Sequence, residues 1–194
     1  MTSVCFIVPA HGRLGMSRAC LGQLARTCSE LDANGVGATA IVIAEDENLD
    51  VAAELGFVAL ERPNRPLGQK INDGYQHAAA AGVDYVIPFG TDDVIDPALL
   101  LGELPTTKVR AHRLVAIVDE TGTRLRRIKV TYEGGDGIRI IPMRMLRNLR
   151  YRPLDDARDR AMDGSMTSRL ARAMRCRPRD LFDYNDLHEL QICE

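Results

Sequence analysis

The first half of this chain alternates short apolar runs with stretches of helical character. Four runs have the length and the β-branched or aromatic content of buried strands, at residues 4–9, 38–44, 57–60 and 85–89. Helices are expected between them, over residues 17–34, 49–55 and 67–81. Strands that alternate with helices of this length predict an α/β fold with a mostly parallel sheet and crossover helices.

Polar residues and glycines mark the expected ends of these helices. Ser17 can cap the first helix through its hydroxyl. Gly35, Gly56 and Gly82 follow the three helices and can stop them, because glycine adopts the left-handed conformation at low cost. The expected helix ends therefore agree with the alternation of strands and helices.

The second half has a different pattern. Residues 113–118 and 124–131 predict two antiparallel strands around a turn at 119–122, and residues 138–141 predict a further strand. Helices are expected over 143–149 and 162–174. A chain of 194 residues is the size of one domain, so we expect an α/β half (1–104) and an antiparallel and helical half (105–194) within a single domain.

Composition favours a soluble protein in a reducing compartment. No apolar run approaches the roughly 20 residues of a membrane span, and the N-terminus has no signal-peptide pattern. The five cysteines are odd in number and have no metal-binding spacing; they are Cys5, Cys20, Cys28, Cys176 and Cys193. We therefore expect reduced thiols and a cytoplasmic location, with no membrane partner.

The net charge of −2 conceals an asymmetry. Residues 1–107 hold 6 Lys and Arg against 14 Asp and Glu, a balance of −8, whereas residues 108–194 hold 19 against 13, a balance of +6. The basic half has two interpretations: a solvated, Arg-rich helical surface, or a face for an anionic acceptor such as nucleic acid or a phosphorylated metabolite.

Polar clusters follow three of the expected strands, at residues 9–13, 45–47 and 90–93. Ligands of parallel α/β sheets bind outside the carboxyl ends of the strands, so these clusters should line one crevice. Asp92 and Asp93 are adjacent carboxylates, which a divalent cation carrying a diphosphate would stabilise. The alternative for one of them is to cap a helix that begins near Pro97, although Asp96 can do this instead.

The order of these features resembles the GT-A glycosyltransferases, in particular the inverting family-two group. The motifs that carry the resemblance are Val8-Pro9-Ala10-His11-Gly12-Arg13, then Glu45-Asp46-Glu47-Asn48, then Asn64, Gly68, Lys70, Asn72 and Gly74, and finally Gly90-Thr91-Asp92-Asp93 before Pro97. The resemblance covers residues 3–100 well and the remainder loosely. It implies a metal-dependent inverting transferase that moves a sugar from a nucleotide-sugar, a UDP- or GDP-sugar first, to a hydroxyl acceptor.

The chain departs from the family pattern at three positions. His11 and Gly12 replace a tyrosine and an asparagine in the loop after the first strand, and Gly90 replaces the first aspartate of the acidic motif. The last change removes one expected contact to ribose or metal.

The resemblance implies a set of donor-binding residues. Glu45, with Asp46 beside it, would accept a hydrogen bond from the base, while Pro9, Ala10, His11 and Arg13 would flank the base or ribose. Lys70, beside Gly68 at a helix N-terminus, would meet a phosphate together with Arg65; Asn72 and Thr91 complete the set. Asp92 would hold Mn²⁺ or Mg²⁺, with Asp93 and His188 as further ligands. The alternative role of Asp46 is a helix cap. The alternative for Lys70 is a solvated side chain, and the alternative for His188 is a packing residue.

The resemblance also implies an acidic residue that deprotonates the acceptor. Asp163 matches it, because Arg169 and Leu170 follow at the family's spacing; its alternative role is to cap the helix that starts there. Asp155 and Asp156 are the other candidates for the base. The loop 134–137 is either a plain turn or a contact to the donor sugar.

Two other functions remain open at this stage. A sugar-phosphate nucleotidyltransferase also combines a nucleotide-binding sheet with Mg²⁺, but it usually has a Gly- and Lys/Arg-rich loop after the first strand; here that segment has only two glycines, Gly12 and Gly15. A non-catalytic module that binds nucleotide-sugars or nucleic acid is the second alternative, which Gly90 favours. For the enzyme, a hydroxylated base in DNA is one acceptor that would use the basic half.

Overall fold

The computed structural model describes residues 1–102, 104, 107–118, 124–129, 138–159 and 162–193. Its first half consists of β1 (Thr2–Pro9), α1 (Leu14–Ala33), β2 (Val36–Ala44), α2 (Asn48–Glu54), β3 (Val58–Glu61), α3 (Leu67–Ala80), β4 (Tyr85–Pro88), β5 (Asp93–Val94) and α4 (Ala98–Leu101). The second half consists of β6 (Val109–Val118), β7 (Arg124–Lys129), β8 (Arg139–Pro142), α5 (Met143–Leu146), η1 (Arg147–Leu149), α6 (Met162–Ala173), η2 (Pro178–Asp180) and β9 (Phe182–Cys193).

One sheet runs through both halves, with the described strands in the order β3-β2-β1-β4-β8-β6-β9-β5 and with β7 paired to β6. The strands β3, β2, β1 and β4 are parallel, as the sequence predicts. From β4 onward the sheet is mixed, because β8 pairs antiparallel with β4 and with β6, while β9 runs parallel to β6. The α/β fold with an antiparallel extension is therefore confirmed.

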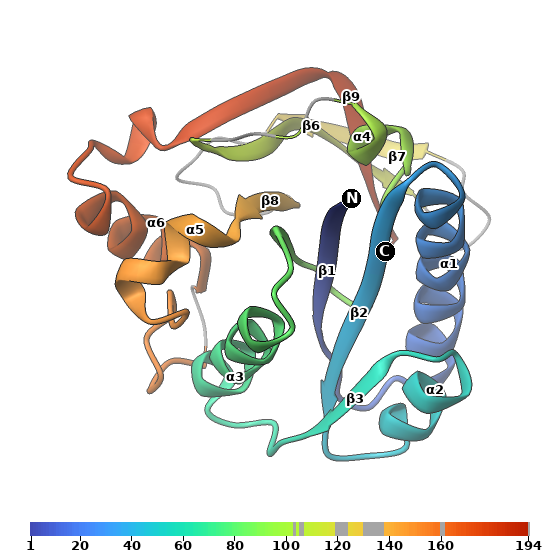
Figure 1. Ribbon diagram of the computed structural model, residues 1–194. Coiled ribbons are helices and arrows are strands. Elements are labelled where there is room, and N and C mark those ends of the chain that lie inside the picture. Colours follow the sequence, from blue (N-terminus) through green and yellow to red (C-terminus); the bar gives the residue numbers. More distant parts are fainter. Residues whose placement is uncertain (103, 105–106, 119–123, 130–137, 160–161, 194) are drawn as a thin grey trace.

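Helices cover both faces of the parallel strands (Figure 1). Helices α1 and α2 lie on one face, and α3, α5 and α6 lie on the other. Alternate residues of β1 divide between two apolar cores: Val4, Phe6 and Val8 pack toward α1, whereas Cys5 and Ile7 pack toward α3 and α6. This period-two division is what a strand covered on both faces requires.

The three expected glycine stops are confirmed by the backbone. Gly35, Gly56 and Gly82 have φ values of 81°, 75° and 74°, the left-handed region in which a side chain is strained. The expected cap is wrong, because α1 starts at Leu14 and Ser17 is buried within it. Gly12 and Arg13, with φ values of 57° and 45°, turn the chain into the helix before Ser17 is reached.

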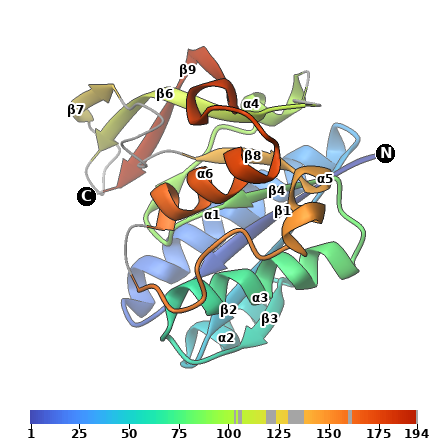
Figure 2. The ribbon, with the colours of Figure 1, turned by 90° about the vertical axis from the view of Figure 1, so that its left-hand side faces the viewer.

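Two strands were not expected from the sequence. The long strand β9 inserts between β6 and the two-residue strand β5, and pairs Ile192 with Asp93. Figure 2 shows β6, β7 and β9 above the parallel strands, with α6 below them and α3 further below. The C-terminal segment therefore returns to the end of the sheet that carries Asp93.

The buried cysteines belong to the cores and have low reactivity. Burial raises the pKa of the Cys5 thiol to about 12 and that of Cys28 to about 12, so neither is a thiolate at neutral pH. None of the described helices is both long enough and apolar enough to cross a bilayer.

Helix α3 lies close to the sheet at Gly74. A Cβ there would stand 2.5 Å from Ile43 Cδ1 and 2.9 Å from Ile7 Cγ2, whereas a Cβ at Gly22 of α1 would meet no atom within 4 Å. We predict that Gly74→Ala lowers the free energy of unfolding by about 1–3 kcal/mol through overpacking. We expect Gly22→Ala to raise it by up to about 1 kcal/mol, because alanine is the better helix former.

Urea unfolding of the two variants beside the wild type checks both signs. Equal midpoints for the two variants would contradict the close approach of α3 to β1 and β2.

Candidate functional site

The loops that follow β1 and β2 are joined by direct hydrogen bonds at the carboxyl ends of the strands. The Gly12 N–H donates to Asp46 Oδ2 at 2.7 Å, and the Asn48 side-chain amide donates to the Gly12 carbonyl at 3.2 Å and to Asp46 Oδ1 at 2.6 Å. Two of the three polar clusters thus meet as expected. The third follows β4, which lies on the other side of β1, so the crevice falls where the strand order changes direction.

The two acidic residues after β2 have different tasks. Burial alone would raise the pKa of Asp46, but the N–H groups of Gly12 and Asn48 outweigh it and hold the pKa below its usual value. The carboxylate of Asp46 therefore holds the loops together, and it also bonds the backbone N–H of Asn48 at the start of α2. Glu45 is exposed, and its carboxylate lies 3.6 Å from Nδ1 of His11. Glu45 is thus the member of the pair that is accessible to a ligand.

Lys70 is buried, with 2% of its surface exposed. Its ammonium donates to the Ala10 carbonyl at 2.7 Å and to Asn64 Oδ1 at 3.2 Å, so it ties α3 to the loop after β1. Burial lowers the pKa of Lys70, and the carboxylates of Glu45 and Asp46 act in the opposite direction. Two of the three N–H groups of this cation are thus used within the chain, as far as the described residues show.

The start of α3 is already capped by the segment 155–159. The N–H of Leu67 donates to Asp159 Oδ1 at 2.9 Å, and the N–H of Gly68 donates to the Arg158 carbonyl at 2.8 Å. A Cβ at Gly68 would overlap the Asp155 carbonyl oxygen, which explains the glycine. The expected open helix terminus for a phosphate is therefore not formed here, because its first donors are used within the chain.

Asn72 also bonds to the second half of the chain rather than to the crevice. Its side-chain amide donates to the Leu154 carbonyl at 3.0 Å and to Asp156 Oδ1 at 2.7 Å, and its oxygen accepts from the Leu154 N–H at 3.0 Å. The residue is fully buried. Asn72, expected to bind the donor, thus has its side-chain N–H groups committed to holding residues 154–156 on α3.

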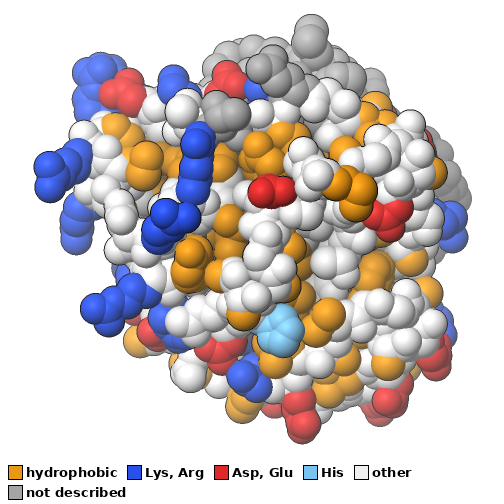
Figure 3. Space-filling model, in the orientation of Figure 1, with side chains coloured by type: hydrophobic (Ala, Val, Ile, Leu, Met, Phe, Trp, Pro, Cys, Tyr) orange, Lys and Arg blue, Asp and Glu red, His pale blue; other side chains and the backbone are white. Residues whose placement is uncertain are grey.

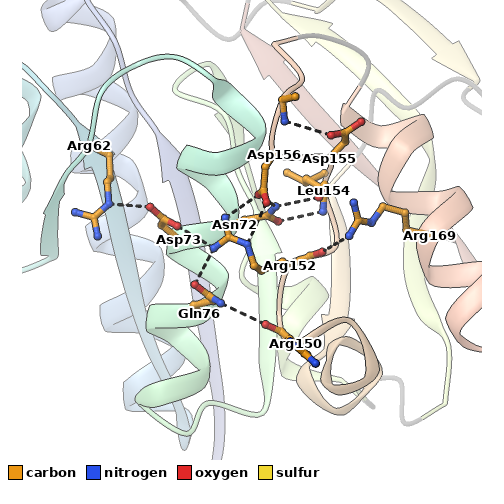
Figure 4. A network of polar contacts seen from close by, with 11 residues as sticks. Arg62, Asn72, Asp73, Gln76, Arg150, Arg152, Leu154, Asp155, Asp156 and Arg169 are labelled. Carbon is orange, nitrogen blue, oxygen red and sulfur yellow. Dashed lines mark hydrogen bonds and ion pairs between the residues drawn. The ribbon is translucent and has the colours of Figure 1, made fainter.

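An arginine that the sequence did not single out as a site residue lies at the centre of this contact (Figure 4). Arg152 donates to Asp73 Oδ1 at 3.1 Å, to Gln76 Oε1 at 2.8 Å and to Asp156 Oδ1 at 2.7 Å. Asp73 also accepts from Arg62 at 2.8 Å. Arg152 and Asp73 are separated by 79 positions, so no local pattern could have paired them.

The same region contains two of the candidate bases, Asp155 and Asp156. The Arg152 guanidinium, with help from the Asn72 amide, holds the pKa of Asp156 below its usual value. Asp155 accepts from the Ala157 N–H at 3.2 Å and lies 3.4 Å from Nε of Arg158. A carboxylate stabilised in this way is a weak base, so Asp156 is a poor candidate for deprotonating an acceptor.

The rim after β4 contains the acidic pair. Asp93 accepts from the Gly90 N–H at 2.6 Å, so one of its oxygens is turned back onto the chain. Asp96 accepts from the Ala98 N–H at 2.9 Å, which confirms that it serves the start of α4 and leaves Asp92 out of that role. A Cβ at Gly90 would lie 2.6 Å from Asp92 Oδ1, so the carboxylate of Asp92 reaches over a position that only glycine leaves open.

The described residues contain no group of three or more His, Cys, Asp or Glu side chains that could hold a metal ion by themselves. That arrangement fits a Mg²⁺ or Mn²⁺ that arrives with its substrate, because such ions are bound through one or two carboxylates together with phosphate oxygens and water. Half-buried Asp92, with the equally half-buried Asp93 next to it, offers the carboxylate.

Some of the remaining candidate site residues are close to these loops, and the side chains of the others are outside the part that the structure describes. Arg13 and Arg65 are exposed, and Thr91 is half-buried in the turn after β4. Asp163 lies in the first turn of α6, and His188 lies in β9; the side chains of both are outside the described part, as is the loop 134–137. Ile192 of the same strand pairs with Asp93.

No known sequence family matches this chain, and no curated protein matches it either. Several solved structures, in contrast, do match this chain. A Drosophila β1,4-galactosyltransferase 7 mutant in complex with manganese, UDP-Gal and xylobiose matches at a TM-score of 0.62 and 12% identity, over 97% of this chain and 66% of that one.

Two nucleotidyl-transferring enzymes match as well. CMP:2-keto-3-deoxy-manno-octonic acid synthetase in complex with CTP has a TM-score of 0.54 and 13% identity, over 100% of this chain and 91% of that one. The 4-diphosphocytidyl-2C-methyl-D-erythritol synthase of Anaerococcus prevotii has a TM-score of 0.55 and 11% identity, over 95% and 87%. The chain thus has the fold shared by glycosyl- and nucleotidyltransferases that handle nucleotide-sugars.

The hydrogen-bond and ion-pair network around Asp156 predicts that the free energy of unfolding depends on pH in the acid range. A group whose folded pKa is lowered contributes stability above its ordinary pKa, and this is lost as the pH falls through the folded value. We therefore expect the free energy of unfolding to fall between about pH 5 and about pH 2, and to fall less in Asp156→Asn. Urea unfolding across this range measures the two slopes.

Glu30→Gln is the matched control, because Glu30 is exposed near the end of α1. Its slope should follow that of the wild type. Identical slopes for Asp156→Asn and the wild type would exclude the proposed contribution of Asp156.

Proposed function

We propose that this chain is a metal-dependent inverting glycosyltransferase that moves a sugar from a nucleoside diphosphate-sugar to a hydroxyl acceptor. The observation that carries the proposal is the short link between β1 and α1. Only residues 10–13 separate the two elements, and two of them are in the left-handed conformation. So short a link has little room for the basic loop with which nucleotidyltransferases grip a triphosphate, whereas the crevice beside it suits a diphosphate donor.

The donor would lie across the carboxyl ends of β1, β2 and β4. Glu45, exposed beside His11, would accept a hydrogen bond from the base, and Pro9, Ala10 and Arg13 would flank the base and ribose. Arg65 and the remaining N–H of Lys70 would face the phosphates. Gly68 and Asn72 would act indirectly, by holding the segment 154–158 in place.

Asp92, with Asp93 beside it, would hold the divalent cation at the rim after β4. When bound, the cation neutralises the charge that develops on the departing diphosphate. Thr91, in the same turn, would complete the ribose and phosphate contacts.

In the displacement, the acceptor hydroxyl attacks the anomeric carbon as the bond from this carbon to the diphosphate oxygen breaks. The base takes the hydroxyl proton, and the configuration at the anomeric carbon inverts. We assign the base to Asp163, since α6 starts on the same side of the molecule as the carboxyl ends of the strands and the start of α3 (Figure 2). The lowered basicity of Asp156 supports this choice.

A nucleotidyltransferase is the second candidate, because the two cytidylyl-transferring structures are covered over 91% and 87% of their length. The two reactions differ in what they release. A nucleotidyltransferase forms pyrophosphate from a nucleoside triphosphate and a sugar phosphate, whereas the proposed enzyme releases a nucleoside diphosphate from a nucleotide-sugar. A pyrophosphate assay with CTP and UTP therefore separates them.

Donor binding should be visible as stabilisation. We expect one of the UDP-, GDP-, ADP- or TDP-sugars to raise Tm by several degrees with Mn²⁺ and by much less without it, because a ligand at about 100 times its Kd adds about 2.7 kcal/mol to the folded state. Thermal unfolding with each donor, with and without Mn²⁺, makes the measurement. No shift with any donor would count against the proposal.

The acidic rim can be tested by a single substitution. We expect Asp92→Asn to lower the Mn²⁺-dependent release of nucleoside diphosphate from the donor by about 100-fold or more, the usual effect of removing one group that stabilises the transition state. Glu30→Gln, which also removes one negative charge but at the opposite end of the sheet, should retain the wild-type rate. Equal rates for Asp92→Asn and the wild type would remove the catalytic claim.

A further inference from the structure

A groove of about 830 Å³ lies between η1 and α6, apart from the proposed donor crevice. One wall is formed by η1 and the segment that follows it, with Asn148 and Arg158; the other wall is formed by α6. The volume lies within the range of small-molecule binding sites in proteins.

The wall contributed by α6 is a single helical face. Ser165, Ser168, Arg169 and Arg172 recur at intervals of three and four residues, so their side chains share one side of the helix. The residues between them, Met166, Leu170 and Ala171, are buried in the core. The polar face is therefore not used for packing and is directed into the groove.

The charge of the groove is positive. Arg158, Arg169 and Arg172 line it together with one carboxylate, Asp155, which leaves two positive charges. Asp155 is engaged by Arg158 and by the Ala157 N–H. Arg169 donates to the Arg152 carbonyl at 3.2 Å, so its guanidinium is anchored by one bond and retains other N–H groups.

The surface around this groove is also basic. Figure 3 shows Lys and Arg side chains gathered at the left edge of the molecule, where α5 and α6 lie in Figure 1. Serine hydroxyls, an asparagine amide and arginine forks are the groups that bind phosphate oxygens in proteins. The chemistry of the lining thus favours a phosphate group over a neutral ligand.

The groove is connected to the proposed active site through the chain. Arg158, which lines the groove, also accepts the Gly68 N–H at the start of α3 through its carbonyl, and α6 carries Asp163 one residue before Gly164 of the groove wall. The groove and the proposed base thus share the first turn of α6.

We propose that the groove between η1 and α6 binds a phosphate group of the acceptor. That the phosphate belongs to the acceptor rests on the proposed function. Phosphate binding by Arg158, Arg172 and the α6 serines does not depend on it. The phosphate belongs either to a phosphorylated small molecule or to a nucleic acid backbone, and the experiment distinguishes the two sources.

The test uses the full chain without donor. Binding of ribose 5-phosphate and of a short fluorescein-labelled DNA duplex is measured for the wild type, Arg158→Gln and Arg172→Gln. We expect each groove variant to weaken one of the two probes by about 10-fold, the loss of one charge-assisted contact. For DNA, the slope of log affinity against log salt should also become shallower by about one.

Arg26→Gln is the matched control, because Arg26 is an exposed arginine of α1, on the other face of the sheet, and bonds only Gln23 among the described residues. It should bind both probes as the wild type does. A loss with ribose 5-phosphate identifies a phosphorylated small acceptor, and a loss with DNA identifies a nucleic acid acceptor.

The proposal is overturned if neither probe binds the wild type, or if the groove variants and Arg26→Gln bind alike. Thermal shifts with the nucleotide-sugar donors are measured on the same variants. If the donors give no shift while the groove variants lose phosphate, the glycosyltransferase proposal fails and the phosphate site stands.

Discussion

The contact between α3 and residues 152–159 is the constraint on which the arrangement of this protein depends. The two halves already share a sheet, but a sheet does not determine where the helices of the second half lie on its face. Asn72, Gly68 and Asp73 of α3 make that determination, through paired amide bonds, a close backbone approach and an ion pair to Arg152. Both ends of the contact are hydrogen-bonded, so the partly buried charges are compensated.

The same contact changes the interpretation of the spacing of Asn64, Gly68, Asn72 and Gly74. From the sequence, these residues suggested a donor site. In the structure, Asn64 holds Lys70, Gly68 and Asn72 hold the second half of the chain, and Gly74 lets α3 approach the sheet. The motif therefore holds the surrounding structure together, and Glu45, His11 and Asp92 remain as the candidates for donor contacts under the proposed function.

Most of the first half could be predicted from the sequence because its signals are local. Each parallel strand is an apolar run, and α1, α2 and α3 are each followed by a glycine with positive φ. Strand β9 has alternating polar residues and no such signal, and β5 has two residues that pair only with β9. The pairing of Arg152 with Asp73 lies between distant positions, as does the use of the α3 donors by Asp159 and Arg158. These features are tertiary, and no local pattern carries them.

The glycine at position 90 has a consequence for how this rim can vary. A Cβ at this position would lie 2.6 Å from Asp92 Oδ1 and 3.2 Å from Asp93 Oδ2, so a larger residue there would require these carboxylates to shift. A substitution of Gly90 would therefore also move the carboxylate that is proposed to bind the cation.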